Sequence, residues 1–283
     1  MGFQKDMDFA DKWYQAVLEK DSVVCAGLDP AEFGMGRGGK GLPEGVDKGQ
    51  WALEYVEAVA PYCAAVKPNI QYWKDIGDME TLTEISRIAH KAGMVVIDDS
   101  KLSDIGSTNE AGVYYTDKHL ADAVTYAPFA MNIEEVAEQG KKWNVGVIAL
   151  CIMSNPEYKV MKNAIVNHEG KDMRMFEYIA MQCGEHDISS VVIGAPNKDK
   201  NHITEEEIGI VRQYLDNQLV LMPGVGEQGG QAGIIWDIFG VNKVIVNEGR
   251  SLMFPAKGYT WETKAIESRD YLNNLRYGAR QVA

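Results

Sequence analysis

MVVIDDSKLSDIGST occupies residues 94–108 and combines an apolar run with closely spaced charges. The β-branched residues at its start are typical of a buried strand, and Asp99 and Lys101 follow at its end. An amphipathic helical pattern begins at Thr108. A strand, a charged tip and a helix in this order predict one unit of a parallel α/β fold.

The same unit repeats along the whole chain. The expected strands are Val23–Leu28, Ala64–Pro68, Met94–Lys101, Ala123–Tyr126, Val145–Ile152, Ser190–Gly194, Leu219–Met222 and Lys243–Val246. The expected helices are Trp51–Ala60, Glu80–Ala92, Thr108–His119, Ile133–Lys142, Met173–Glu185, Glu205–Asn217, Gln231–Phe239 and Thr260–Arg276. Eight alternating units predict a (β/α)8 TIM barrel that forms a single domain over residues 1–283.

A doubly wound open sheet is the alternative fold. It is disfavoured because LDPAEFGMGRGGKG, residues 28–41, follows the first strand without the compact glycine turn of a dinucleotide-binding fold. Two long loops, Pro30–Lys48 and Asn155–Lys171, follow the first and fifth strands. In a barrel both would lie at the C-terminal rim of the strands, where active sites are built.

Composition narrows the class of protein. The formal net charge of −13 argues against nucleic-acid binding, which needs a basic face. No apolar stretch approaches the ~20 residues of a membrane span. The first 20 residues are charged and amphipathic, so we expect a cytoplasmic protein. The four cysteines, Cys25, Cys63, Cys151 and Cys183, lack ligand spacing and are expected to be buried apolar residues.

Charged residues stand at the ends of three neighbouring predicted strands. Asp29 ends the first strand, Lys67 the second, and Asp99 and Lys101 the third, with Asp104 shortly beyond. Asp99 and Lys101 are two apart and point to one side, whereas Asp98 and Ser100 point to the other. A lone aspartate after a strand is usually a turn or helix cap, as Asp104 could be. Two lysines among three aspartates instead indicate a network tuned for proton transfer.

These charged residues belong to a longer series of short motifs. IDDSKLSDIGST, residues 97–108, resembles the Asp-x-Lys-x-x-Asp-Ile signature of the orotidine 5'-phosphate decarboxylase family. The similarity continues through GLDP (27–30), VKPN (66–69), SNP (154–156), PGVGEQGG (223–230) and EGRS (248–251). Their order at barrel spacing over nearly the whole chain makes this resemblance specific.

The resemblance implies decarboxylation of orotidine 5'-phosphate to uridine 5'-phosphate and CO2, the last step of de novo pyrimidine (UMP) biosynthesis. It implies a catalytic array of Lys67, Asp99, Lys101 and Asp104, with neither a metal nor an organic cofactor. Lys101 would stabilise the developing C6 carbanion and then protonate it.

The resemblance also implies substrate contacts and a homodimer with shared active sites. Asp29 and Asn69 match residues that bind the ribose, and Ser154 matches one that binds the pyrimidine. Met153 departs from the threonine common before that serine. Asp104, Ile105 and Thr108 match residues that reach into the neighbouring subunit's site.

The glycine-rich run 223–230 and the Gly249–Arg250 pair predict a phosphate site after the seventh and eighth strands. Arg250 can hold phosphate oxygens in a bidentate arrangement. The resemblance adds Gln228 as a phosphate ligand, with Gln231 as an open alternative. Glu248 departs from the commoner glycine-rich form of this loop.

Two other functions compete with decarboxylation of the nucleotide. A magnesium-dependent sugar-phosphate decarboxylase or aldolase of the same superfamily shares the Asp-x-Lys-x-x-Asp element. These magnesium-dependent enzymes resemble one another in having an acidic metal ligand at the tip of the second strand. This chain has Lys67 at that position. A non-catalytic phosphate-binding barrel is the second competitor, and it would not require Asp99 beside Lys101.

Overall fold

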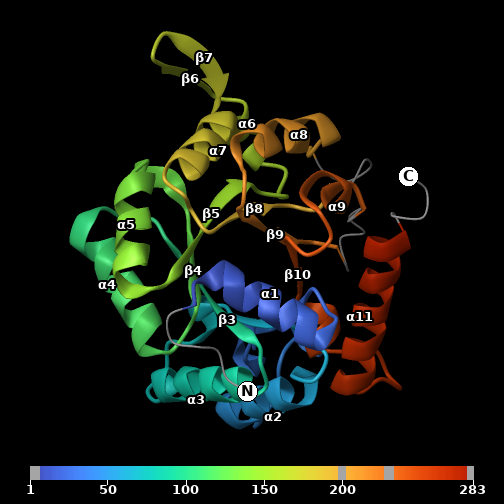
Figure 1. Cartoon of the computed structure of the whole chain (residues 1–283). Helices are drawn as coiled ribbons and strands as arrows, with labels where there is room; N and C mark the ends of the chain where they lie inside the picture. The colour runs from blue at the N-terminus through green and yellow to red at the C-terminus, as the bar shows by residue number, and fades with distance from the viewer. Residues whose placement is uncertain (1–6, 197–201, 226–232, 279–283) are drawn as a thin grey trace.

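The computed structural model describes residues 7–196, 202–225 and 233–278, and its centre is a closed barrel of eight parallel strands (Figure 1). The barrel strands are β1 (Val24–Leu28), β2 (Ala65–Pro68), β3 (Val95–Leu102), β4 (Ala123–Tyr126), β5 (Gly146–Ile152), β8 (Ser190–Ile193), β9 (Leu219–Pro223) and β10 (Val244–Glu248). The barrel closes because β10 pairs with β1. The predicted barrel is confirmed, and the open-sheet alternative, which leaves two unpaired edges, is wrong.

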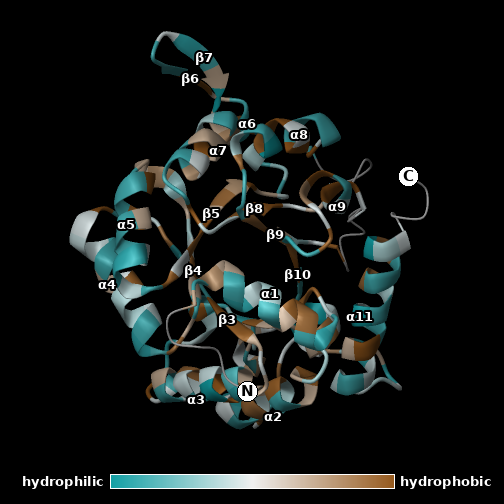
Figure 2. Ribbon diagram, viewed as in Figure 1, coloured by the Kyte–Doolittle hydropathy of each residue, from teal (hydrophilic) through white to brown (hydrophobic). Residues whose placement is uncertain are grey.

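All eight predicted strands are present, each within two residues of its expected ends. Their β-branched residues are buried on both faces, between the barrel interior and the surrounding helices (Figure 2). The four cysteines are free and buried, as predicted.

Helices surround the barrel with their polar faces outward (Figure 2). They are α1 (Phe9–Lys20), α2 (Lys48–Val59), α3 (Asp78–Lys91), α4 (Gly106–Lys118), α5 (Ile133–Trp143), α6 (Tyr158–Lys162), α7 (Met175–Glu185), α8 (Glu205–Tyr214), α9 (Gly233–Phe239), α10 (Arg250–Met253) and α11 (Trp261–Gly278). In the described part of the chain, none of them has the length and apolar character needed to cross a membrane.

Helix α1, which was not among the expected helices, packs against the N-terminal ends of the strands. Its Trp13 indole donates a hydrogen bond to the Asn242 carbonyl at 2.8 Å. Phe9 packs so closely on Gly146 that a Cβ atom at residue 146 would lie 2.6 Å from the Phe9 Cβ. This packing leaves the opposite, C-terminal end of the barrel for the charged residues.

The two long loops at that end contain secondary structure of their own. Residues 30–48 include two 3₁₀ turns, η1 (Phe33–Met35) and η2 (Gly38–Lys40). The loop after β5 contains α6 and an antiparallel hairpin of β6 (Ile165–His168) and β7 (Lys171–Arg174). The hairpin projects away from the barrel (Figure 1). The expected helix start at Met173 was therefore wrong, because that residue pairs within the hairpin.

Candidate active site

Lys67, Asp99 and Lys101 meet at the C-terminal end of β2 and β3. The Lys67 Nζ lies 2.5 Å from one Asp99 carboxylate oxygen, and the Lys101 Nζ lies 2.7 Å from the other. Lys67 and Asp99 are buried, whereas 42% of the Lys101 side chain is exposed. One carboxylate thus stands between two ammonium groups, of which only Lys101 reaches the open rim.

Burial and charge act in opposite directions on these groups. Burial raises the pKa of the Asp99 carboxyl, but Lys67 and Lys101 outweigh burial and bring that pKa below its ordinary value. Burial lowers the pKa of Lys67, yet Asp99 and Asp29 together raise it above its ordinary value. Within this Lys-Asp-Lys cluster of Lys67, Asp99 and Lys101, the Asp99 carboxylate and the Lys67 ammonium are therefore each stabilised in the charged form.

The backbone at Lys101 is unusual for a strand. Its φ of +53° lies in the left-handed region, which costs a non-glycine residue ~1–2 kcal/mol. The register of β3 against β4 shifts between Asp98 and Leu102. Thr125 on β4 stabilises this backbone conformation. Its hydroxyl accepts a hydrogen bond from the Lys101 N–H and donates one to the Asp99 carboxylate, both at 2.9 Å. Local strain of this kind occurs at functional sites, and Thr125 is the residue that holds it in place here.

Asp98 and Ser100 lie on the other face of β3, as their spacing predicted. The buried Asp98 carboxylate accepts hydrogen bonds from Ser100 and Thr116, away from the Lys-Asp-Lys cluster. Burial raises the pKa of Asp98 to about 6. Asp98 therefore belongs to the contact between β3 and α4, and not to the open end of the barrel.

Asp29 and Asn69 follow β1 and β2 beside the cluster. Burial raises the pKa of the Asp29 carboxyl, and Lys67 opposes this shift. One Asp29 oxygen, Oδ1, is buried and has no hydrogen-bond partner among the residues that the structure describes. The Asn69 side chain accepts from the Gln71 N–H at 3.2 Å and so fixes the turn η3 (Ile70–Tyr72). A buried acceptor without a partner is costly unless a ligand or water satisfies it.

Asp104, Ile105 and Thr108 face outward from the rim after β3. All three are exposed, and among the described residues no hydrogen bond or ion pair joins the Asp104 carboxylate to Lys67 or Lys101. The Asp104 carboxylate accepts instead from the Ile105 N–H at 2.8 Å. Asp104, which the sequence allowed as a possible cap, is not the N-cap residue of α4, because Ile105 occupies that position without a side-chain hydrogen bond.

The remaining predicted residues lie at the ends of other strands. Ser154 follows β5 and is partly buried, and Met153 before it packs on the hydrophobic core. Arg250 follows β10 as the first residue of α10. Glu248 points away from the rim and accepts a hydrogen bond from Ser268 on α11 at 2.7 Å. Gln228 and Gln231 lie outside the described residues.

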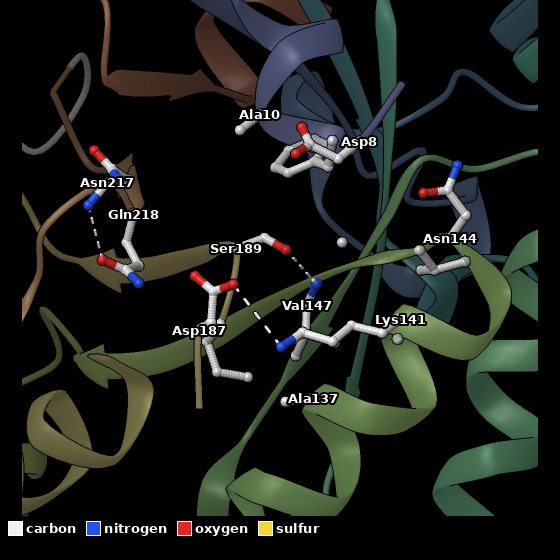
Figure 3. Close-up of a pocket in the computed structure, with 15 residues that line it drawn as sticks. Asp8, Ala10, Ala137, Lys141, Asn144, Val147, Asp187, Ser189, Asn217 and Gln218 are labelled. Atoms are coloured by element: carbon white, nitrogen blue, oxygen red, sulfur yellow. Dashed lines mark hydrogen bonds and ion pairs between the residues drawn. The ribbon is translucent and has the colours of Figure 1, made fainter. Parts of the chain in front are cut away.

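A cavity of about 370 Å³ lies at the other end of the barrel (Figure 3). Its lining includes Phe9 of α1, Val147 of β5, Ser189 and Gln218. These residues stand at the N-terminal ends of the strands, so the cavity is separate from the Lys-Asp-Lys cluster and contains none of the predicted site residues.

Several known proteins are similar to this chain over nearly its whole length. The family model described as "Orotidine 5'-phosphate decarboxylase / HUMPS family" matches residues 22–251. An orotidine 5'-phosphate decarboxylase from Natronomonas pharaonis is 32% identical, over 98% of this chain and 97% of its own length. One from Leptothrix cholodnii is 29% identical, over 97% of this chain and 100% of its own length.

A solved structure agrees with this result at the level of the fold. The OMP decarboxylase of Leishmania donovani superposes with a TM-score of 0.75 at 23% identity, and the match covers 96% of this chain and 99% of that one. The chain therefore belongs to the orotidine 5'-phosphate decarboxylase / HUMPS family.

Proposed function

We propose that this protein is an orotidine 5'-phosphate decarboxylase, which converts its substrate to uridine 5'-phosphate and CO2 in pyrimidine biosynthesis. The observation that carries the proposal is the buried Asp99 carboxylate between Lys67 and Lys101 at the C-terminal end of a (β/α)8 barrel. Active sites of this fold lie at that end. We also propose that residues 1–283 form one catalytic domain.

In the proposed reaction, the bond between C6 of the pyrimidine and its carboxylate breaks, and CO2 leaves. The electron pair of that bond remains on C6, where a fixed cation stabilises it. Lys101 is placed for this role, since its side chain is more exposed at the rim than that of Lys67. It then transfers one proton to C6. We assign Asp99 to the side of the departing carboxylate, and Lys67 to holding Asp99 in position.

The other residues bind the rest of the nucleotide. Asp29, with its unpartnered buried oxygen, and Asn69 are proposed to bind the ribose hydroxyls. Ser154 is assigned to the pyrimidine ring. Arg250, with Gln228 or Gln231, is assigned to the phosphate, whose binding energy can close loops over the ring and raise the rate.

The proposal is tested by following the loss of orotidine 5'-phosphate absorbance with purified protein, with and without EDTA. We expect equal rates, because the proposed chemistry uses the Lys101 cation where the competing superfamily members use Mg²⁺. Activity that EDTA abolishes and Mg²⁺ restores would favour the sugar-phosphate enzymes. A protein that binds uridine 5'-phosphate without turnover would indicate the non-catalytic barrel.

Arg250→Ala should weaken binding of uridine 5'-phosphate while leaving uridine binding unchanged. Loss of a charge-assisted phosphate contact is expected to cost about 2–3 kcal/mol of binding free energy. Titration of both ligands into each variant measures the difference. Lys257→Ala, which removes an exposed cation seven residues further along the chain, is the matched control. Equal weakening of the nucleotide and the nucleoside by Arg250→Ala would refute the assignment.

We further propose a homodimer in which Asp104, Ile105 and Thr108 complete the partner's active site. The exposure of Ile105 (64%) supports this proposal, as does that of Ile76 and Phe129 on the adjacent loops after β2 and β4. Exposed apolar side chains grouped on one rim are typical of a surface that another protein covers. The four free cysteines are consistent with the proposed cytoplasmic location.

A further inference from the structure

A buried ion pair joins two loops on the side of the barrel that carries Ser154. Lys162, the last residue of α6, lies 2.6 Å from both carboxylate oxygens of Glu207 in the first turn of α8. It also donates to the His202 carbonyl oxygen at 2.6 Å. Only 3% of the Lys162 side chain and 7% of the Glu207 side chain are exposed. The pair fixes the segment after β5 to the beginning of α8.

Two more hydrogen bonds hold the residues between Ser154 and α6. The His202 ring lies 3.0 Å from the Asn155 carbonyl oxygen, and Asn155 directly follows Ser154. The Tyr158 hydroxyl donates to the Cys151 carbonyl oxygen on β5 at 2.8 Å. The short turn that carries Ser154 is therefore tied to β5 on one side and to the segment before α8 on the other.

Ser154 itself packs against the end of β8. A Cβ atom at Gly194 would lie 2.8 Å from the Ser154 Cβ and 3.0 Å from the Ser154 nitrogen. The same atom would lie 2.8 Å from the Ile203 side chain, next to His202. The absence of a side chain at residue 194 thus allows Ser154 to take its place between two strand ends.

The energetics of the ion pair favour a geometric role. The cost of removing two charges from water cancels much of their attraction, so a buried pair adds little stability over apolar residues of similar size. Its directional contacts, in contrast, specify one arrangement of the chain. Glu207 has a second role in that arrangement, because it forms a capping box with Thr204 at the beginning of α8.

We propose that Lys162 and Glu207 are positioning residues that hold Ser154 in the orientation in which it binds the pyrimidine ring. The inference rests on the proposed function. Neither residue touches the Lys-Asp-Lys cluster, so the ion pair acts through the turn that carries Ser154.

The test is a double-mutant cycle in kcat/KM for orotidine 5'-phosphate. Lys162→Met and Ser154→Ala should each lower kcat/KM about tenfold, the effect of one lost hydrogen bond. With Ser154→Ala already present, Lys162→Met should cost less than about twofold, because the two changes remove the same contact. Lys159→Met, an exposed lysine on the same helix, is the matched control and should match the wild type.

Lys162→Met leaves the Glu207 charge buried without its main partner and can weaken folding. Lys162→Met/Glu207→Gln removes both charges, and its thermal midpoint measures whether the fold is retained. The tenfold loss should persist in this variant. Ribose 5-phosphate, which lacks the pyrimidine, should bind all variants with the wild-type affinity.

The outcomes separate the inference from the function on which it rests. Independent, multiplicative losses in the cycle, or wild-type kcat/KM for Lys162→Met, would overturn the positioning role while leaving decarboxylation intact. Weakened ribose 5-phosphate binding would also overturn it, because the disturbance would then extend beyond Ser154. A wild-type protein inactive on orotidine 5'-phosphate would overturn the proposed function and this inference with it.

Discussion

Replacement of Lys101 by alanine is expected to lower the turnover of orotidine 5'-phosphate by ~10²–10⁴-fold. This range is the usual contribution of a positioned proton donor. The same residue also supplies the cation that stabilises the charge on C6, so the loss should exceed the lower end of this range. Binding of uridine 5'-phosphate should change far less, because the Lys101 cation is needed mainly as charge develops in the transition state.

The structure indicates that this variant should fold. Asp99 keeps its contacts with Lys67 and Thr125 when Lys101 is removed, so its buried carboxylate retains a charged partner and a hydrogen-bond donor. Circular dichroism and the thermal midpoint check this expectation. Lys74→Ala removes another exposed lysine, from the loop after β2, and should leave turnover unchanged. A Lys101→Ala protein with more than a tenth of wild-type turnover would mean that another group protonates C6.

Most of the barrel could be predicted from the sequence because its signal is local. Each strand is buried on both faces, so it consists of a short run of apolar residues, and a charged or glycine residue marks the end of most strands. The same pattern placed Lys67, Asp99 and Lys101 at one rim, where the structure brings each lysine Nζ within 2.7 Å of an Asp99 carboxylate oxygen.

What the sequence did not predict depends on contacts between distant residues. The left-handed backbone of Lys101 and its support by Thr125 follow from the register of β3 against β4, which residue type alone does not specify. The Lys162–Glu207 pair joins residues 45 positions apart. In the sequence Lys162 looks like an ordinary charge in a loop, and Glu207 like an ordinary surface charge of a helix.

The β6–β7 hairpin is a different case, because a local signal was present. Glu169 and Gly170, between two short segments, both have positive φ, as a type I′ turn requires. The flanking residues are mainly polar, so the expected apolar alternation of a hairpin was weak and the segment was interpreted as a loop.

The second large effect concerns the proposed sharing of active sites between two subunits. Lys101→Ala and Asp104→Ala should each be inactive alone, and a mixture of the two should regain roughly a quarter of wild-type activity. In a mixed dimer one site receives both lesions and the other receives neither. Random pairing of equal amounts makes half of the dimers mixed, and each mixed dimer has one intact site of two.

The position of Asp104 is the structural reason for this expectation. Its exposed carboxylate is directed to the Ile105 N–H, and among the described residues neither Lys67 nor Lys101 contacts it. A twofold axis near this rim would bring the same segment of each chain to the other's site. The mixture must be shown to exchange subunits, for example by purifying dimers that carry two different affinity tags. If purified mixed dimers remain inactive while each parent variant is folded and dimeric, Asp104 acts within its own subunit and the shared site is wrong.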